Sequence, residues 1–173
     1  MRRFFLPFLV FFAFISEGIF AHLVHFSFAQ QDQLFVPRFL LIVVIFITVY
    51  LTRAQGMLFG LIFGLLHDIV YIEVMGIYLI VYALFAYLIS KAMRVLHNNI
   101  FIVLLLTVLS IAILEFYVFG VNYLIGTTNM SMYDFTTLRL LPTLGLNAAV
   151  ALLVIYPFKR YLTKIKIDES DEL

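Results

Sequence analysis

The sequence predicts an all-α polytopic membrane protein with six transmembrane helices and both termini in the cytoplasm. Three observations lead to this fold class. The composition is strongly apolar, long apolar stretches alternate with short polar ones along the chain, and the basic residues gather on one side of that alternation. We expect a single integral membrane domain over residues 1–173, because the polar segments are too short to form an extramembrane domain.

The composition argues for a lipid environment. Hydrophobic residues make up 65% of the 173 residues and charged residues 12%, whereas a soluble domain is usually about 45–50% apolar and about 25% charged. In water, a chain of this size would bury only about 70% of its surface. The apolar excess would then form large exposed patches, which soluble monomers avoid.

The six helices are predicted from apolar stretches that approach the roughly 20 residues needed to cross a hydrocarbon core. The second stretch begins near Pro37, which suits a first helical turn, and it is short enough that we expect local bilayer thinning around it. A polar patch at residues 126–129 ends the fifth, and a charged tail at 159–173 follows the sixth. The predicted spans are residues 4–23, 37–52, 56–71, 74–92, 100–125 and 135–158.

The first span has an alternative interpretation. Arg2 and Arg3 before an apolar run are also typical of a secretory signal peptide. However, Glu17 interrupts the run and no small-residue cleavage site precedes His22, so a membrane helix is favoured.

The orientation follows from the basic residues, since Lys and Arg in short loops concentrate on the cytoplasmic side. Only Arg38 and Arg139 fall on one side of the predicted spans. The other side, which also holds both termini, collects Arg2, Arg3, Arg53, Lys91, Arg94, Lys159, Arg160, Lys164 and Lys166.

Three acidic residues lie within the predicted spans, where a charge at the helix centre costs about 2.5–3.5 kcal/mol. From the helical rise, Glu17, Asp68 and Glu115 all reach the outer half of the bilayer. We therefore predict an outer polar layer in which Arg139 and Arg38 supply counter-charges. A role in fixing helix packing is favoured over a partner-binding or ligand-lined cavity, and both over proton or ion passage.

Glycine spacing marks the third span. Gly56, Gly60, Gly64 and Asp68 are each four residues apart and so share one helix face. Without side chains, this face allows a neighbouring backbone to approach closely. The favoured interpretation is an internal helix seam, and the alternative is a groove that docks another protein's helix.

Early in the sixth span, Pro142 predicts a kink.

No catalytic or metal-binding pattern is visible. The chain has no Cys, no nucleophile elbow and no phosphate-binding loop, so we expect neither an enzyme nor a bound metal or cofactor. The net charge of +1 gives no reason to expect a nucleic-acid partner. We interpret the four histidines as interfacial residues: His22, His25, His67 and His97.

Residues 60–68 carry the pattern Gly-x-x-x-Gly-x-x-x-Asp and are continued by Gly-Ile-Tyr at 76–78. Together with segments 2–8, 36–40 and 114–120, they form an ordered set along the chain. This set resembles the Bacillus-type members of the bacterial MreD family of rod-shape-determining proteins. The resemblance covers almost the whole chain, although no single motif in it is specific.

This resemblance implies a non-catalytic scaffold in the plasma membrane that supports lateral peptidoglycan synthesis and cell shape. Its implied partners are MreC, bound directly, and MreB, RodA and a class B penicillin-binding protein in the same complex, together with membrane lipid. It also implies a fold similar to the substrate-binding subunits of energy-coupling-factor transporters. The glycine stripe and the outer polar layer are the candidate contacts with MreC.

The sequence gives less support to two other functional classes. A vitamin-type transporter subunit would share the six helices and cytoplasmic termini, but it needs an outward pocket with convergent polar groups, whereas the predicted outer loops are short and poor in donors. An intramembrane enzyme is disfavoured because no nucleophile–base pair is visible.

Overall fold

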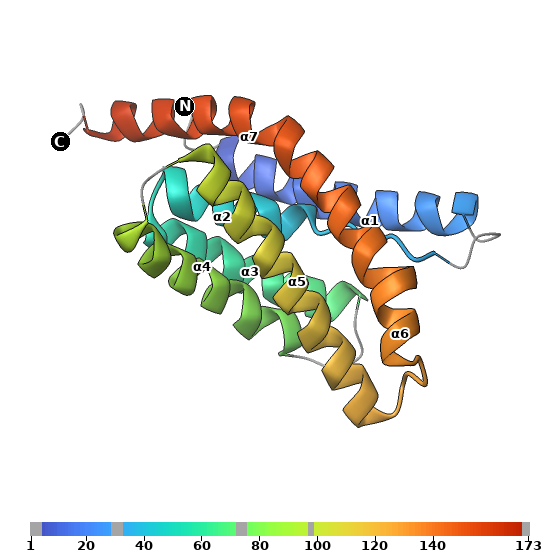
Figure 1. Ribbon diagram of the computed structural model, residues 1–173. Coiled ribbons are helices and arrows are strands. Elements are labelled where there is room, and N and C mark those ends of the chain that lie inside the picture. The colour runs from blue at the N-terminus through green and yellow to red at the C-terminus, as the bar shows by residue number, and fades with distance from the viewer. Residues whose placement is uncertain (1–4, 29–32, 72–75, 97–98, 171–173) are drawn as a thin grey trace.

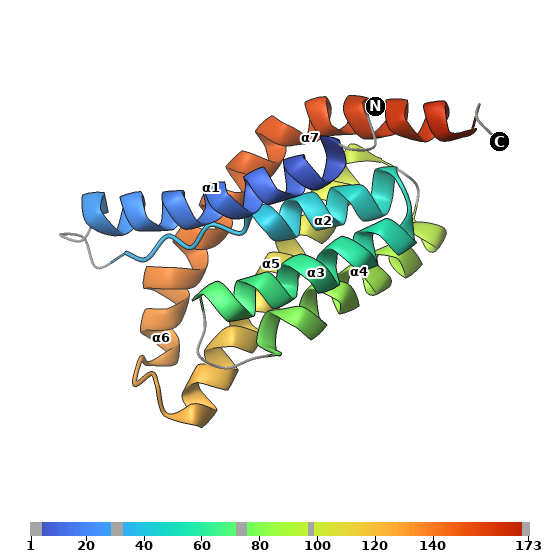
Figure 2. The ribbon, with the colours of Figure 1, turned by 180° about the vertical axis from the view of Figure 1, so that it is seen from behind.

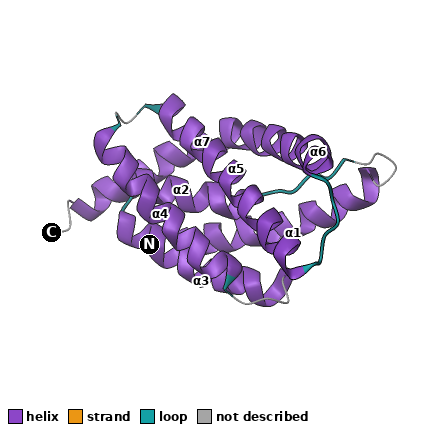
Figure 3. Ribbon diagram, turned by 60° about the horizontal axis from the view of Figure 1, so that its bottom comes forward, coloured by secondary structure: helices purple, strands orange, loops and turns teal. Residues whose placement is uncertain are grey.

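The computed structural model describes residues 5–28, 33–71, 76–96 and 99–170, and every regular element among them is a helix (Figure 3). The prediction of an all-α chain is therefore confirmed for the described residues. Five helical segments are long and apolar enough to cross a membrane, and α2 is shorter. The elements are α1 (Phe5–Phe28), α2 (Phe39–Tyr50), α3 (Arg53–Tyr71), α4 (Ile77–Val95), α5 (Ile100–Ile125), α6 (Met132–Asp134), η2 (Phe135–Leu140) and α7 (Leu141–Ser170).

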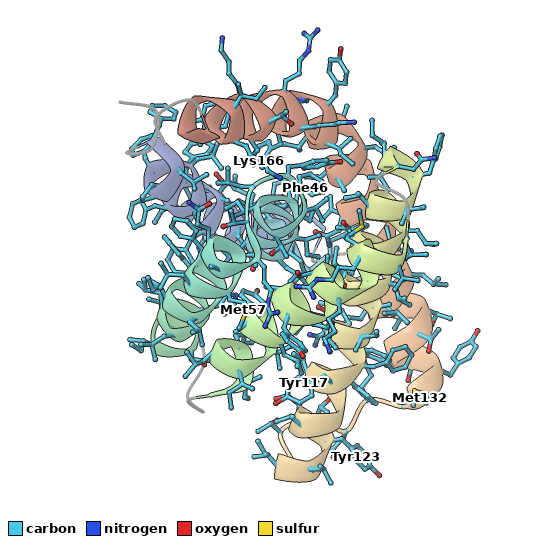
Figure 4. The ribbon with its side chains drawn as sticks, turned by 90° about the vertical axis from the view of Figure 1, so that its left-hand side faces the viewer. Phe46, Met57, Tyr117, Tyr123, Met132 and Lys166 are labelled. Carbon is cyan, nitrogen blue, oxygen red and sulfur yellow. The ribbon has the colours of Figure 1, made fainter. Side chains whose placement is uncertain are left out.

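Helix α2 forms the centre of the molecule (Figures 1 and 2). Ten of its 12 residues are buried, and it packs against α1, α3, α4, α5 and α7. Figure 4 shows Phe46 of α2 in the interior of the bundle. A helix that is apolar all round belongs in such a core. Other helices therefore cover most of the surface of α2, and the local bilayer thinning expected around this short span stays a prediction.

Helices α3 and α4 form the closest pair, and the glycines of α3 make this possible. A Cβ added to Gly60 would lie 3.1 Å from the backbone N of Ala83, and one on Gly64 would lie 2.7 Å from the carbonyl O of Tyr78. A Cβ on Gly56 would collide with the side chain of Thr48 on α2. The stripe is thus an internal seam against α4 and α2. It does not form the open docking groove that was the alternative interpretation.

The sixth predicted span is irregular near Pro142, as expected, but the irregularity precedes the proline. Residues Phe135–Leu140 form a π-helix, η2, and Pro142 is the second residue of α7. Helix α7 bends in its second half (Figure 1), where Pro157 lies inside the helix and has no N–H to donate. The tail predicted from residue 159 is a helical continuation of α7 as far as Ser170.

The part of α7 after Pro157 lies across one end of the bundle. The ring of Tyr161 lies 6.4 Å from that of Phe5 at the start of α1, and the Lys159 ammonium lies 5.9 Å from the ring centre of Tyr50 at the end of α2. Figure 4 shows Lys166 at this end, while Tyr123 and Met132 lie at the opposite end. This end also holds the start of α3 and the end of α4 (Figures 1 and 2), so we call it the basic end, defined by Arg53, Lys91, Arg94, Lys159, Arg160, Lys164 and Lys166.

Candidate functional site

A buried carboxylate between two guanidinium groups is the centre of the candidate site. Glu115 of α5 is fully buried. Its Oε1 accepts from Nε of Arg38 at 2.7 Å and lies 2.6 Å from Nη2 of the same residue, while its Oε2 accepts from Nε of Arg139 at 3.0 Å. Both arginines predicted as counter-charges therefore share one acid. Because Arg38 precedes α2 and Arg139 belongs to η2, the two contacts of Glu115 connect α5 to the start of α2 and to η2.

Arg38 reaches this position because the segment before α2 folds into the bundle. The backbone N of Arg38 donates to Oδ1 of Asn147 at 2.7 Å, and Nδ2 of Asn147 donates to the carbonyl O of Val36 at 2.8 Å. The N–H of Val36 in turn donates to Oγ1 of Thr143 at 3.1 Å. Asn147 and Thr143 of α7 are fully buried, and together they satisfy backbone groups that have no helical partner.

Pro142 contributes to the same junction. Pro142 has no N–H to donate to a carbonyl of the preceding turn. The carbonyl O of Leu138, in that turn, accepts from the backbone N of Leu34 at 2.7 Å. The irregular turn before α7 thus supplies an acceptor for the segment that carries Arg38.

Glu17 of α1 joins α1 to α2 and α3. Its Oε2 accepts from the backbone N of Leu40, in the first turn of α2, at 2.9 Å, where a negative charge also suits the positive end of the helix dipole. Its Oε1 lies 3.1 Å from Nε2 of His67. His67 is buried, with 6% of its surface exposed. Its interpretation as an interfacial residue is therefore wrong, because it is held among α1, α3 and α4.

Asp68 has a separate role at the start of α4. Its Oδ1 accepts from the N–H of Tyr78 at 2.9 Å, and its Oδ2 accepts from Gly76 at 2.9 Å and Leu79 at 3.0 Å. Gly76 has φ of 101°, a left-handed conformation that suits glycine. Asp68 therefore caps α4. Among the described residues its oxygens bind backbone N–H groups, whereas the predicted polar layer paired it with a guanidinium.

The ring of Tyr78 connects the two acid–base groups. The imidazole of His67 stacks on it, with ring centres 4.2 Å apart, and the guanidinium of Arg38 lies 5.2 Å from its centre on the α2 side. The structure thus places Arg38 and His67 against one aromatic side chain, and Glu17 contacts the same His67. A cation beside an aromatic face is favoured when both are shielded from water.

This arrangement fastens helices together. Five of the six carboxylate oxygens of the three buried acids accept from groups of the chain itself, and the sixth, Oε1 of Glu17, lies 3.1 Å from Nε2 of His67. Within the described part of the chain, no group of three or more His, Cys, Asp or Glu residues could hold a metal ion. Of the eight predicted site residues, the structure brings Glu17, Arg38, Glu115 and Arg139 around the start of α2, and places Asp68 and the three glycines in the α3 interfaces.

Reasoning from sequence missed three contributors to this network: His67, Thr143 and Asn147. His67 is adjacent to a conspicuous aspartate, but its role depends on how α1 crosses α3. The signal for Thr143 and Asn147 is their position beside Pro142, where polar side chains one helical turn apart face the same way.

Comparison with known proteins agrees with the family resemblance seen in the sequence. The family model for rod shape-determining protein MreD matches residues 2–165. A rod shape-determining protein MreD from Bacillus subtilis (strain 168) is 42% identical over 172 residues, which covers 99% of this chain and 100% of that protein. No solved structure matches the chain.

Proposed function

The chain belongs to the MreD family of rod shape-determining proteins, and we propose that it is a non-catalytic membrane scaffold of the machinery that elongates rod-shaped cells. In this proposal it lies in the plasma membrane with both termini in the cytoplasm. It binds MreC directly and works in one complex with MreB, RodA and a class B penicillin-binding protein, supporting lateral peptidoglycan synthesis.

The observation that carries the scaffold proposal is the complete pairing of the buried acids. Every carboxylate oxygen of Glu17, Asp68 and Glu115 lies within hydrogen-bond distance of a polar group of the chain. An acid that relays protons or ions must exchange its partners during each cycle. Acids fixed in this way instead hold six helical segments in one arrangement, which is what a docking platform needs.

A small pocket beside the network favours the scaffold over the transporter alternative. It is lined by Glu17, Arg38 and His67 among others and measures about 150 Å³. Binding sites for small organic ligands are usually about 300–1,000 Å³, whereas one water occupies about 30 Å³. This pocket suits a few waters better than a vitamin.

The candidate contact with MreC moves away from the glycine stripe, because that stripe is covered by α4 and α2. We propose a groove of about 370 Å³ between α1 and α7 instead, with α2 as its floor. Its α1 wall includes two small residues, Ala13 and Ser16. Small residues allow the close backbone approach on which helix association in lipid depends.

The test is co-purification of MreC from detergent at matched expression. The wild-type chain is expected to retain MreC, and Ser16→Phe, which fills the groove, is expected to reduce the retained amount by about tenfold, or roughly 1.4 kcal/mol. Leu105→Phe is the matched control, since Leu105 is 68% exposed on α5 and lies outside the groove. If wild type never retains MreC, the scaffold proposal fails. If both variants retain it equally, only the groove assignment fails.

A further inference from the structure

A second hollow lies at the basic end, far from the buried network. It measures about 340 Å³ and sits between the start of α5 and the part of α7 around and after Pro157. Three cations line it, Lys159, Arg160 and Lys164, and none of its described lining side chains is acidic. Three gathered positive charges, with no acidic residue among the described lining side chains, favour an anionic ligand.

The other lining groups show what kind of anion fits. Tyr156 and Thr163 bring hydroxyl groups, which can donate to phosphate oxygens. The guanidinium of Arg160 lies 4.9 Å from the ring centre of Tyr156, so both groups occupy the same side of α7. Ile100 and Ile167 make the remaining wall apolar. One side of the hollow is therefore positively charged and the other side is apolar.

The exposed surface of α7 before Pro157 continues the apolar side of the hollow along the helix. Leu152, Leu153 and Tyr156 are 59%, 79% and 56% exposed. Leu153, Tyr156 and Arg160 are spaced three and four residues apart, so they form one line along the helix. A molecule lying along this line would place an apolar chain on the leucines and its charged end in the hollow.

We propose that this hollow binds the phosphate headgroup of an anionic phospholipid, with an acyl chain lying on Leu152 and Leu153. Arg160 and Lys164 hold the phosphate by charge-assisted hydrogen bonds. Basic pockets at the membrane surface bind anionic headgroups in this way. The apolar line favours a lipid over a free phosphate ion, which would gain nothing from the leucines. The site is independent of the scaffold function and of the MreC groove.

The test is native mass spectrometry of the full chain in detergent with added phosphatidylglycerol or phosphatidylcholine of identical acyl chains. Wild type is expected to bind phosphatidylglycerol preferentially. In Arg160→Gln/Lys164→Gln, affinity for phosphatidylglycerol is expected to fall by about tenfold or more, at about fivefold per lost cation. The control Lys91→Gln/Arg94→Gln removes two exposed cations from the same end but outside the hollow. The affinity of this control variant for phosphatidylglycerol is expected to stay within about twofold of that of the wild type.

Three results would overturn the proposal: equal binding of the two lipids by wild type, an equal loss in both double variants, or displacement of the lipid by millimolar inorganic phosphate. The last would assign the hollow to a soluble anion. Should the double variant not insert, Arg160→Gln and Lys164→Gln are measured singly, each with an expected loss of about fivefold, and no loss in either would also overturn it.

Discussion

At the scale of single residues, the central feature is that Glu115 neutralises both Arg38 and Arg139. Glu115→Gln keeps the shape of the side chain but removes the negative charge that two guanidinium groups share, one of them buried. We expect a loss of about 3–5 kcal/mol in the free energy of unfolding, measured by thermal or denaturant unfolding in detergent. Asp134→Asn, at a partly exposed acid that bonds Ser131, is the control and should change stability by less than about 1 kcal/mol. Equal stability of Glu115→Gln and wild type would contradict the account.

Residues of this kind are partly predictable from sequence. A carboxylate inside an apolar stretch is conspicuous, and its cost in lipid implies a partner, so Glu17, Asp68 and Glu115 stood out together with Arg38 and Arg139. Which acid meets which base was not predictable, because it depends on the path of residues 33–38 into the bundle. Asn147 and Thr143, which hold that path, are ordinary residues by type, and only their positions in the fold make them important.

At the scale of elements, the contact between α3 and α4 depends on the absence of side chains at Gly60 and Gly64. In Gly64→Ala the new Cβ would lie 2.7 Å from the Tyr78 carbonyl O and 2.9 Å from Cα of Leu79. Both are backbone atoms that cannot turn aside, so the helices must separate. We expect destabilisation of about 1–3 kcal/mol, measured as a lower unfolding midpoint in detergent.

The matched control is Gly120→Ala on α5, where a Cβ meets no atom of the described structure within 4 Å. Because alanine favours a helix over glycine, this change is expected to be neutral or stabilising by up to about 1 kcal/mol. Similar destabilisation of both variants would show that the close approach of α3 and α4 is not what the glycines provide. The four-residue spacing predicted a close helix contact, but the identity of the neighbour required the fold.

At the scale of the whole molecule, the basic end predicts which end faces the cytoplasm. The chain has no cysteine, so a variant with one introduced cysteine is labelled by a thiol reagent at that position alone. Thr163→Cys lies at the basic end, and Thr127→Cys lies in the loop between α5 and α6 at the opposite end. A membrane-impermeant maleimide added to intact cells should label Thr127→Cys at once and Thr163→Cys only after permeabilisation. The reverse pattern would invert the proposed topology.

The measurement that tests the account most directly is cell shape. In Bacillus subtilis, the MreD that is 42% identical to this chain would be replaced by this chain, produced with its own MreC. Cell width and length would then be measured by microscopy at matched membrane levels of the protein. The account predicts regular rods whose width equals that of the parent strain. Rounded or swollen cells, despite stable insertion of both proteins, would contradict a scaffold role in rod shape.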